Sequence, residues 1–147
     1  MTTTAKKKPA AFILGKRPET IPATVQLTLP TGEIHAIECK FKYRTRTEFG
    51  QLWDSLSKPK PQAPAPDAGQ DQQEQPVAPP EQVTFTAALD DANRINVDHT
   101  LQFLAGWNLE YDLTPENLGQ LFDEVPAAAS ELFEAYRAAM VHGRLGN

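Results

Sequence analysis

Residues 58–82 contain seven prolines, six glutamines and no aromatic residue. A stretch of this composition lacks the large apolar side chains that a packed core needs, so we expect a disordered, partly extended Pro/Gln-rich linker. The remainder of the 147-residue chain is then two short pieces, which together can bury one ordinary core or two very small ones. Residues 1–20, which lack sustained periodicity, are expected to be a flexible arm.

Residues 21–57 are predicted to form a β-hairpin and a short helix. Apolar residues alternate with polar ones from Val25 to Leu29, the period of two that puts one set of side chains on a single face of a sheet. The sequence Pro-Thr-Gly at 30–32 supplies turn chemistry. The second strand alternates in the same way, with Ile37, Cys39, Phe41 and Tyr43 on one face and Glu38, Lys40, Lys42 and Arg44 on the other.

After the hairpin, apolar residues recur at helical spacing at Phe49, Leu52, Trp53 and Leu56. Either Thr45 or Thr47 can act as the N-cap of this helix. Because two strands alone are marginally stable, we expect the apolar side of the helix to cover the apolar face of the hairpin. Cys39 would then be a small buried thiol rather than a nucleophile.

Residues 83–147 are predicted to form a small helical bundle. Their start, residues 83–89, fits both a strand and a helix. From Asp98, a good N-cap, a helix is expected to run to the region of Gly106 and Trp107. The expected fold class is therefore α+β, with an N-terminal hairpin and helix, the linker and a C-terminal helical bundle.

Two further helices are predicted in this bundle. The strongest helix start is Thr114, an N-cap followed by Pro115 and Glu116. The apolar stripe of this helix consists of Leu118, Leu121, Phe122 and Val125. Pro126 ends the helix and can open the last one, which runs to Gly143 and repeats the stripe at Leu132, Phe133, Tyr136, Ala139 and Met140.

The two parts of the chain carry opposite charge. Residues 1–60 hold 11 Lys and Arg against 5 Asp and Glu, whereas residues 61–147 hold 3 against 14, within a net charge of −5. We interpret the basic residues as a lysine-rich tail and a solvated strand face rather than a nucleic-acid site. With a mean hydropathy of −0.46 and no long apolar run, the chain is expected to be cytoplasmic and not membrane-bound.

No catalytic or metal-binding motif stands out in the sequence, so we expect neither an enzyme nor a cofactor. The carboxylates from Glu110 to Glu124 lie at a helix start or on polar helix faces, where solvated side chains are expected. The three histidines, His35, His99 and His142, have no second metal ligand at helical spacing. The single cysteine can form no internal disulfide.

A bundle of about 50 residues has a high ratio of surface to volume, so some of its apolar side chains are expected to stay accessible. An accessible apolar groove in a small acidic protein suits the capture of an amphipathic helix. We therefore predict that partner-binding residues lie on the apolar helix faces, at Trp107, Leu118, Leu121, Phe122, Phe133, Tyr136 and Met140.

Several short motifs follow one another in the C-terminal part: Gly-Trp at 106–107, Thr-Pro-Glu-Asn-Leu at 114–118, Leu-Phe-Asp-Glu-Val-Pro at 121–126, Ala-Tyr at 135–136 and a terminal Gly-Arg-Leu-Gly-Asn. In this order they resemble the C-terminal part of phage tail assembly chaperones, small proteins encoded beside the tape measure gene of long-tailed phages and prophages. The passage from Lys40 to Phe49 is similar to the strand-to-helix passage of the same proteins. The resemblance covers roughly residues 24–57 and 95–147.

This resemblance implies a non-catalytic role. The chain would bind the tape measure protein in the cytoplasm of the bacterial host, keep it soluble until tail-tube subunits assemble around it, and then leave, so that it is absent from the mature virion. The tail tube protein and a second copy of the chain are further candidate partners. Two other functions stay open: a structural tail component, such as a tube or completion protein, and a small nucleic-acid-binding regulator that uses the basic hairpin.

Overall fold

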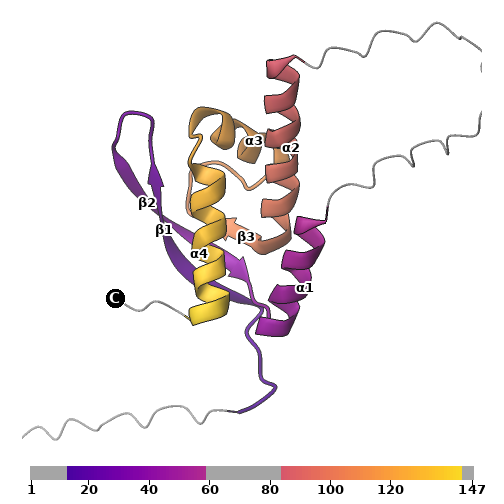
Figure 1. Ribbon diagram of the computed structural model, residues 1–147. Coiled ribbons are helices and arrows are strands. Elements are labelled where there is room, and N and C mark those ends of the chain that lie inside the picture. Colours follow the sequence, from indigo (N-terminus) through magenta and orange to yellow (C-terminus); the bar gives the residue numbers. More distant parts are fainter. Residues whose placement is uncertain (1–12, 59–83, 144–147) are drawn as a thin grey trace, which may run out of the picture.

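The computed structural model describes residues 13–58 and 84–143. In chain order its elements are β1 (Thr20–Thr28), β2 (Ile34–Lys42), α1 (Arg46–Ser57), α2 (Phe85–Phe103), β3 (Leu104–Trp107), α3 (Pro115–Glu124) and α4 (Ala128–His142). Figure 1 shows the hairpin of β1 and β2 with α4 lying across it, and α2 rising past the end of α1. The α+β class is confirmed. The predicted linker, apart from Lys58, and residues 1–12 of the predicted arm lie outside the described residues.

The hairpin has the predicted period of two. Strand β1 pairs with β2 in antiparallel register, with Val25 opposite Ile37. The odd-numbered apolar residues from Val25 to Leu27 and from Ile37 to Phe41 are buried, whereas Ile21 and Ala23 are half-buried. The tip closes through hydrogen bonds of 2.8 Å from the N–H of Leu29 to the carbonyl of Glu33 and from the N–H of Gly32 to the carbonyl of Leu29. Gly32 adopts a φ of 89°. Glycine takes this left-handed conformation at the lowest energetic cost, because it has no Cβ.

The helix predicted from Asp98 to about Trp107 is wrong at both ends. Helix α2 begins much earlier, with Thr84 as its N-cap, and ends at Phe103. Residues 104–107 instead form β3, which pairs with the free edge of β2. A strand is more favourable than a further helical turn here because Leu104 becomes buried. In addition, Gly106 is a poor helix former whose backbone can hydrogen-bond to the strand edge instead.

A single hydrophobic core contains residues that precede residues 59–83 in the sequence and residues that follow them. Its centre is Tyr136 on α4, which is fully buried and stacks on Phe103 with ring centroids 4.7 Å apart. The rings of Phe41 and Phe49 meet Tyr136 edge-on, at 5.4 Å and 5.5 Å. Ring pairs of this kind contribute about 0.5–1.5 kcal/mol each beyond the burial of their area. These aromatic contacts therefore bind β2, α1, α2 and α4 into one unit.

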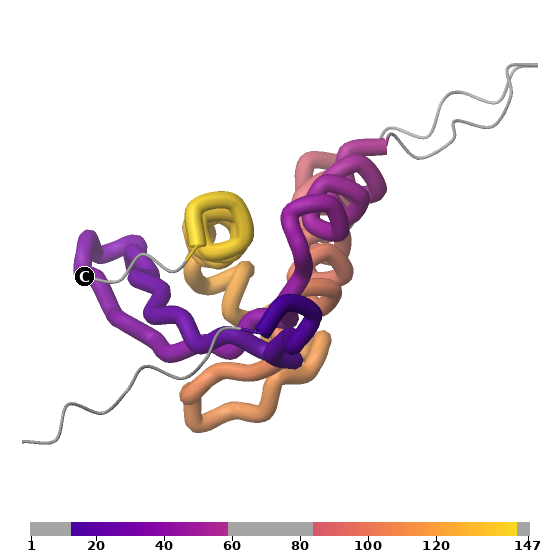
Figure 2. The backbone as a smooth tube through the Cα atoms, turned by 90° about the horizontal axis from the view of Figure 1, so that it is seen from below, coloured from indigo at the N-terminus to yellow at the C-terminus, as the bar shows by residue number. Residues whose placement is uncertain are grey.

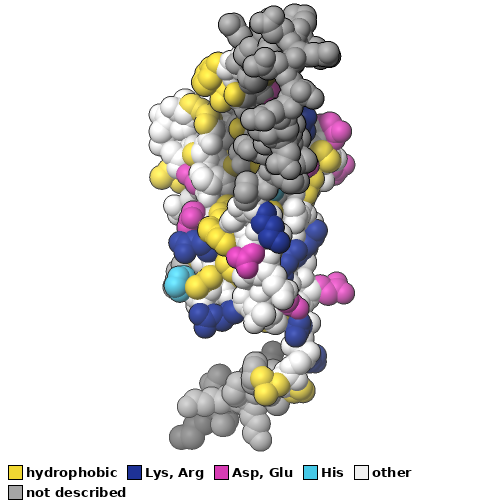
Figure 3. Space-filling view, turned by 45° about the vertical axis from the view of Figure 1, so that its right-hand side comes forward, with side chains coloured by type: hydrophobic (Ala, Val, Ile, Leu, Met, Phe, Trp, Pro, Cys, Tyr) yellow, Lys and Arg dark blue, Asp and Glu magenta, His cyan; other side chains and the backbone are white. Residues whose placement is uncertain are grey.

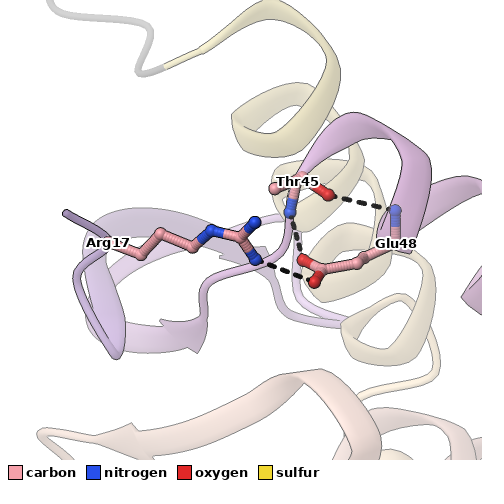
Figure 4. Close-up of polar contacts among 3 residues, drawn as sticks. All are labelled: Arg17, Thr45 and Glu48. Atoms are coloured by element: carbon pink, nitrogen blue, oxygen red, sulfur yellow. Dashed lines mark hydrogen bonds and ion pairs between the residues drawn. The ribbon is translucent and has the colours of Figure 1, made fainter. Parts of the chain in front are cut away.

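The N-cap of α1 is Thr45 rather than Thr47, because Thr45 and Glu48 form a capping box (Figure 4). The Thr45 hydroxyl accepts a hydrogen bond from the N–H of Glu48 at 3.2 Å, and the N–H of Thr45 donates to the Glu48 carboxylate at 2.8 Å. Two backbone groups at the helix start are thereby satisfied. The same carboxylate accepts from Arg17 at 2.9 Å, which connects the segment before β1 to α1.

Basic residues at the end of β2 hold the C-terminus of α2. The ammonium group of Lys42 donates to the carbonyl of Leu101 at 3.0 Å, and Arg44 donates to the carbonyl of Gln102 at 2.8 Å. Carbonyl groups in the last turn of a helix have no partner within the helix and carry its negative dipole end, so cations stabilise them. Lys40 and Lys42 are exposed, in agreement with the interpretation of a solvated strand face, and Lys42 also stabilises the end of α2.

Within residues 13–58 and 84–143, no helix combines the length and the hydropathy that a membrane span requires. On the face seen in Figure 3, lysine and arginine side chains gather mainly over the lower half of the molecule.

Candidate functional site

Helices α1, α2 and α4 surround a groove of about 370 Å³. Seen from below in Figure 2, α4 stands apart from α1 and α2, which overlap in this view because α1 lies below α2 in Figure 1. None of the described lining residues is a lysine, arginine, aspartate or glutamate. The lining consists of Trp53, Leu56 and Ser57 from α1, Asn96, His99, Thr100 and Phe103 from α2, and Pro126, Ala129, Ser130 and Phe133 from α4 and the turn before it. The groove therefore suits an apolar group better than a charged one.

Three aromatic rings form the floor and rim of this groove. Phe103 is buried at the floor, and its ring lies 5.8 Å from that of Phe133. Trp53 lies 5.2 Å from Phe133 on the other side and is 41% exposed. A large, partly exposed indole beside a buried ring offers new apolar contact area without unfolding any part of the core.

The seven predicted partner-binding residues fall into two groups. Four are buried in the core: Leu118, Phe122, Tyr136 and Met140. Three are partly exposed, and of these only Phe133 lines the groove. Trp107 lies on β3 and donates to the carbonyl of Tyr111 at 2.6 Å, while Leu121 lies on α3. The structure thus brings Phe133 to the groove and places the other six residues elsewhere.

Sequence reasoning missed Trp53, which it placed on the stripe that covers the hairpin. The signal for its second role is its neighbour Leu52. Consecutive residues of an α-helix point about 100° apart, so when Leu52 points into the core, Trp53 lies at the edge of the apolar stripe. Leu52 is buried and Trp53 is the partly exposed one, which directs the indole toward the groove.

The described titratable groups offer little for catalysis. Burial raises the pKa of the Cys39 thiol to about 12, which suppresses the reactive thiolate, and the predicted burial of this residue is confirmed. Burial also raises the pKa of the Tyr136 hydroxyl, while the nearby Arg44 opposes that effect. No cluster of three or more His, Cys, Asp or Glu suited to a metal ion occurs among residues 13–58 and 84–143.

These features define a small α+β protein with an uncharged, aromatic groove between three helices. A family model described as phage tail assembly chaperone matches residues 8–147. The chain belongs to the phage tail assembly chaperone family. No curated protein and no solved structure matches it.

Proposed function

We propose that this chain is a non-catalytic chaperone that binds the tape measure protein of its phage or prophage. It would act in the cytoplasm of the host, keep its partner soluble until the tail tube forms, and be absent from the mature virion. The family match over residues 8–147 supports the role in tail assembly. The tape measure protein is inferred as the partner from the sequence resemblance.

The observation that carries the proposed mode of binding is the groove with Trp53 on its rim and Phe133 in its wall. Burial of one large apolar side chain of the partner there would contribute about 1.5–3 kcal/mol. That is too little for a tight complex, because association itself costs several kcal/mol. Several copies binding along one long partner would reach useful avidity while each copy still dissociates readily.

Co-expression with the tape measure protein tests this proposal. The soluble fraction is separated by size-exclusion chromatography, and both chains are quantified across the peak. We expect them to co-elute, and we expect the tape measure protein to be insoluble when expressed alone. If its solubility does not depend on this chain, the proposal is wrong.

A pair of matched variants tests the groove in the same experiment. Trp53→Ser removes an exposed aromatic side chain at the rim, and Tyr111→Ser removes one that is 67% exposed outside the groove. Trp53→Ser should lower the recovered complex, whereas Tyr111→Ser should leave it unchanged. Equal loss in both variants would place the contact elsewhere. Stable incorporation of the chain into purified virions would instead favour a structural tail component.

A further inference from the structure

The floor of the groove continues along α2 beyond the groove itself. Phe85, Leu89, Ala92, Asn96 and Phe103 are spaced by three, four or seven residues, so they lie on one side of this helix. The last two line the groove. Phe85 is 78% exposed and Leu89 is 53% exposed, so the first half of the same helix side is open.

The geometry of the helices explains why this half is open. Helix α1 ends at Ser57, beside the groove, whereas α2 extends well past it (Figure 1). From Phe85 to Phe103 the helix rises about 27 Å, or five turns. We call this side of α2, together with Trp53 and Phe133, the α2 track.

The charges around the track are predominantly negative. Helices α1, α2 and α4, which border the track, contain seven Asp and Glu against three Arg, and Lys58 follows the end of α1. Two of these arginines form ion pairs within their own helices, Arg94 with Asp91 and Arg137 with Glu134. The carboxylate of Asp54 also directly follows the rim residue Trp53 in sequence. Fields from such exposed charges reach about 8–10 Å at ordinary ionic strength, far enough to act on a partner lying in the track.

We propose that the α2 track takes a single amphipathic helix of about five turns, whose apolar stripe is flanked by lysine or arginine. This rests on the proposed function, in which the helix belongs to the tape measure protein. A helix satisfies its own backbone hydrogen bonds, whereas an extended segment would need partners that an apolar track does not supply. The negative surroundings select basic flanks over acidic ones.

The test uses the full chain and dye-labelled synthetic peptides whose side chains are cross-linked to hold them helical. One peptide has about 18 residues, with leucines at i, i+3, i+4 and i+7 and flanking lysines, and a second is its glutamate-flanked twin. A third, with lysine flanks and about nine residues, spans only half of the track. Binding is measured by fluorescence anisotropy at low and high salt.

We expect the long lysine peptide to bind at least about tenfold more tightly than its glutamate twin at low salt, and we expect the difference to shrink at high salt. The double variant Phe85→Ser/Leu89→Ser should weaken binding of the long peptide about tenfold or more, because two apolar contacts are lost. The same double variant should leave the affinity for the short peptide unchanged if that peptide occupies the groove. Ile34→Ser, at an exposed apolar position on the hairpin, is the control and should change nothing.

Two outcomes would overturn the proposal. Equal binding of the lysine and glutamate peptides at low salt would refute the choice of basic flanks. Long-peptide binding that ignores Phe85→Ser/Leu89→Ser would refute the track, and circular dichroism verifies that the variant is folded. Failure of the proposed function looks different: the peptides bind as expected, but the tape measure protein does not co-elute with the chain.

Discussion

Arg44 donates a hydrogen bond of 2.9 Å to the hydroxyl of Tyr136, which joins the end of β2 to the ring at the centre of the core. Its second nitrogen holds the carbonyl of Gln102. The guanidinium of Arg44 thus connects the end of β2 to α4 and α2. Arginine suits this position better than lysine, because the planar, forked guanidinium directs separate N–H groups at the two acceptors.

Replacing this arginine should destabilise the fold. Arg44→Ala leaves the buried hydroxyl of Tyr136 without a partner, and an unsatisfied buried polar group costs about 1–3 kcal/mol. Urea unfolding monitored by circular dichroism measures the change. Arg46→Ala, at an exposed arginine two residues later, should change the free energy of unfolding much less. A similar loss in both variants would contradict the role given to Arg44.

The N-cap of α1 is the second target. Thr45→Ala removes the hydroxyl that accepts from Glu48, and loss of such a cap costs about 0.5–2 kcal/mol. Thr47→Ala is the matched control, because Thr47 is exposed within α1. If the two variants unfold at the same urea concentration, the capping box does not stabilise α1 in solution.

The same box predicts a pH dependence. Hydrogen bonds from Thr45, with help from Arg17, hold the pKa of Glu48 below its usual value of 4.5. A carboxyl group with a lowered folded-state pKa stabilises the fold above its unfolded pKa, and that contribution disappears as the pH falls through the folded-state pKa. Wild type should therefore be more stable than Glu48→Gln at pH 7, with a difference that shrinks toward pH 3. Urea unfolding across this range measures it, and a constant difference would argue against an ionised Glu48 as the cause.

Cys39 should resist alkylation while the protein is folded. Its pKa is raised to about 12 by burial, and the thiolate is the reactive form. At pH 8, iodoacetamide should modify native protein at least about a hundredfold more slowly than protein unfolded in urea. Mass spectrometry follows both reactions. Comparable rates would mean that the core opens readily around β2.

Much of the fold follows from local sequence patterns. The hairpin period, the Pro-Thr-Gly turn and the start of α3 at Thr114 were predicted because alternation, turn chemistry and capping act within a few residues. Strand β3 was missed because its partner, β2, lies more than 60 residues away. Nothing local distinguishes residues 104–107 from one more helical turn except Gly106.

The binding surface was harder to predict, since an apolar stripe does not reveal which of its members are covered. Phe133 and Tyr136 are neighbours on one helix face, yet Tyr136 is buried among rings from β2, α1 and α2, and Phe133 lines the groove. Only the positions of the other helices separate the two roles. The same limit hid Phe85 and Leu89, whose exposure depends on where α1 ends.

The pairing of β2 with β3 has a consequence for the timing of synthesis. The hairpin leaves the ribosome first, but the strand that completes its sheet and the helix that covers it come from residues beyond 103. At about 5–20 residues per second, the roughly 100 residues from the end of β2 to the end of α4 take about 5–20 seconds to translate. For that interval the apolar face of the hairpin lacks the helix that covers it in the folded protein, so the nascent chain is itself exposed to aggregation.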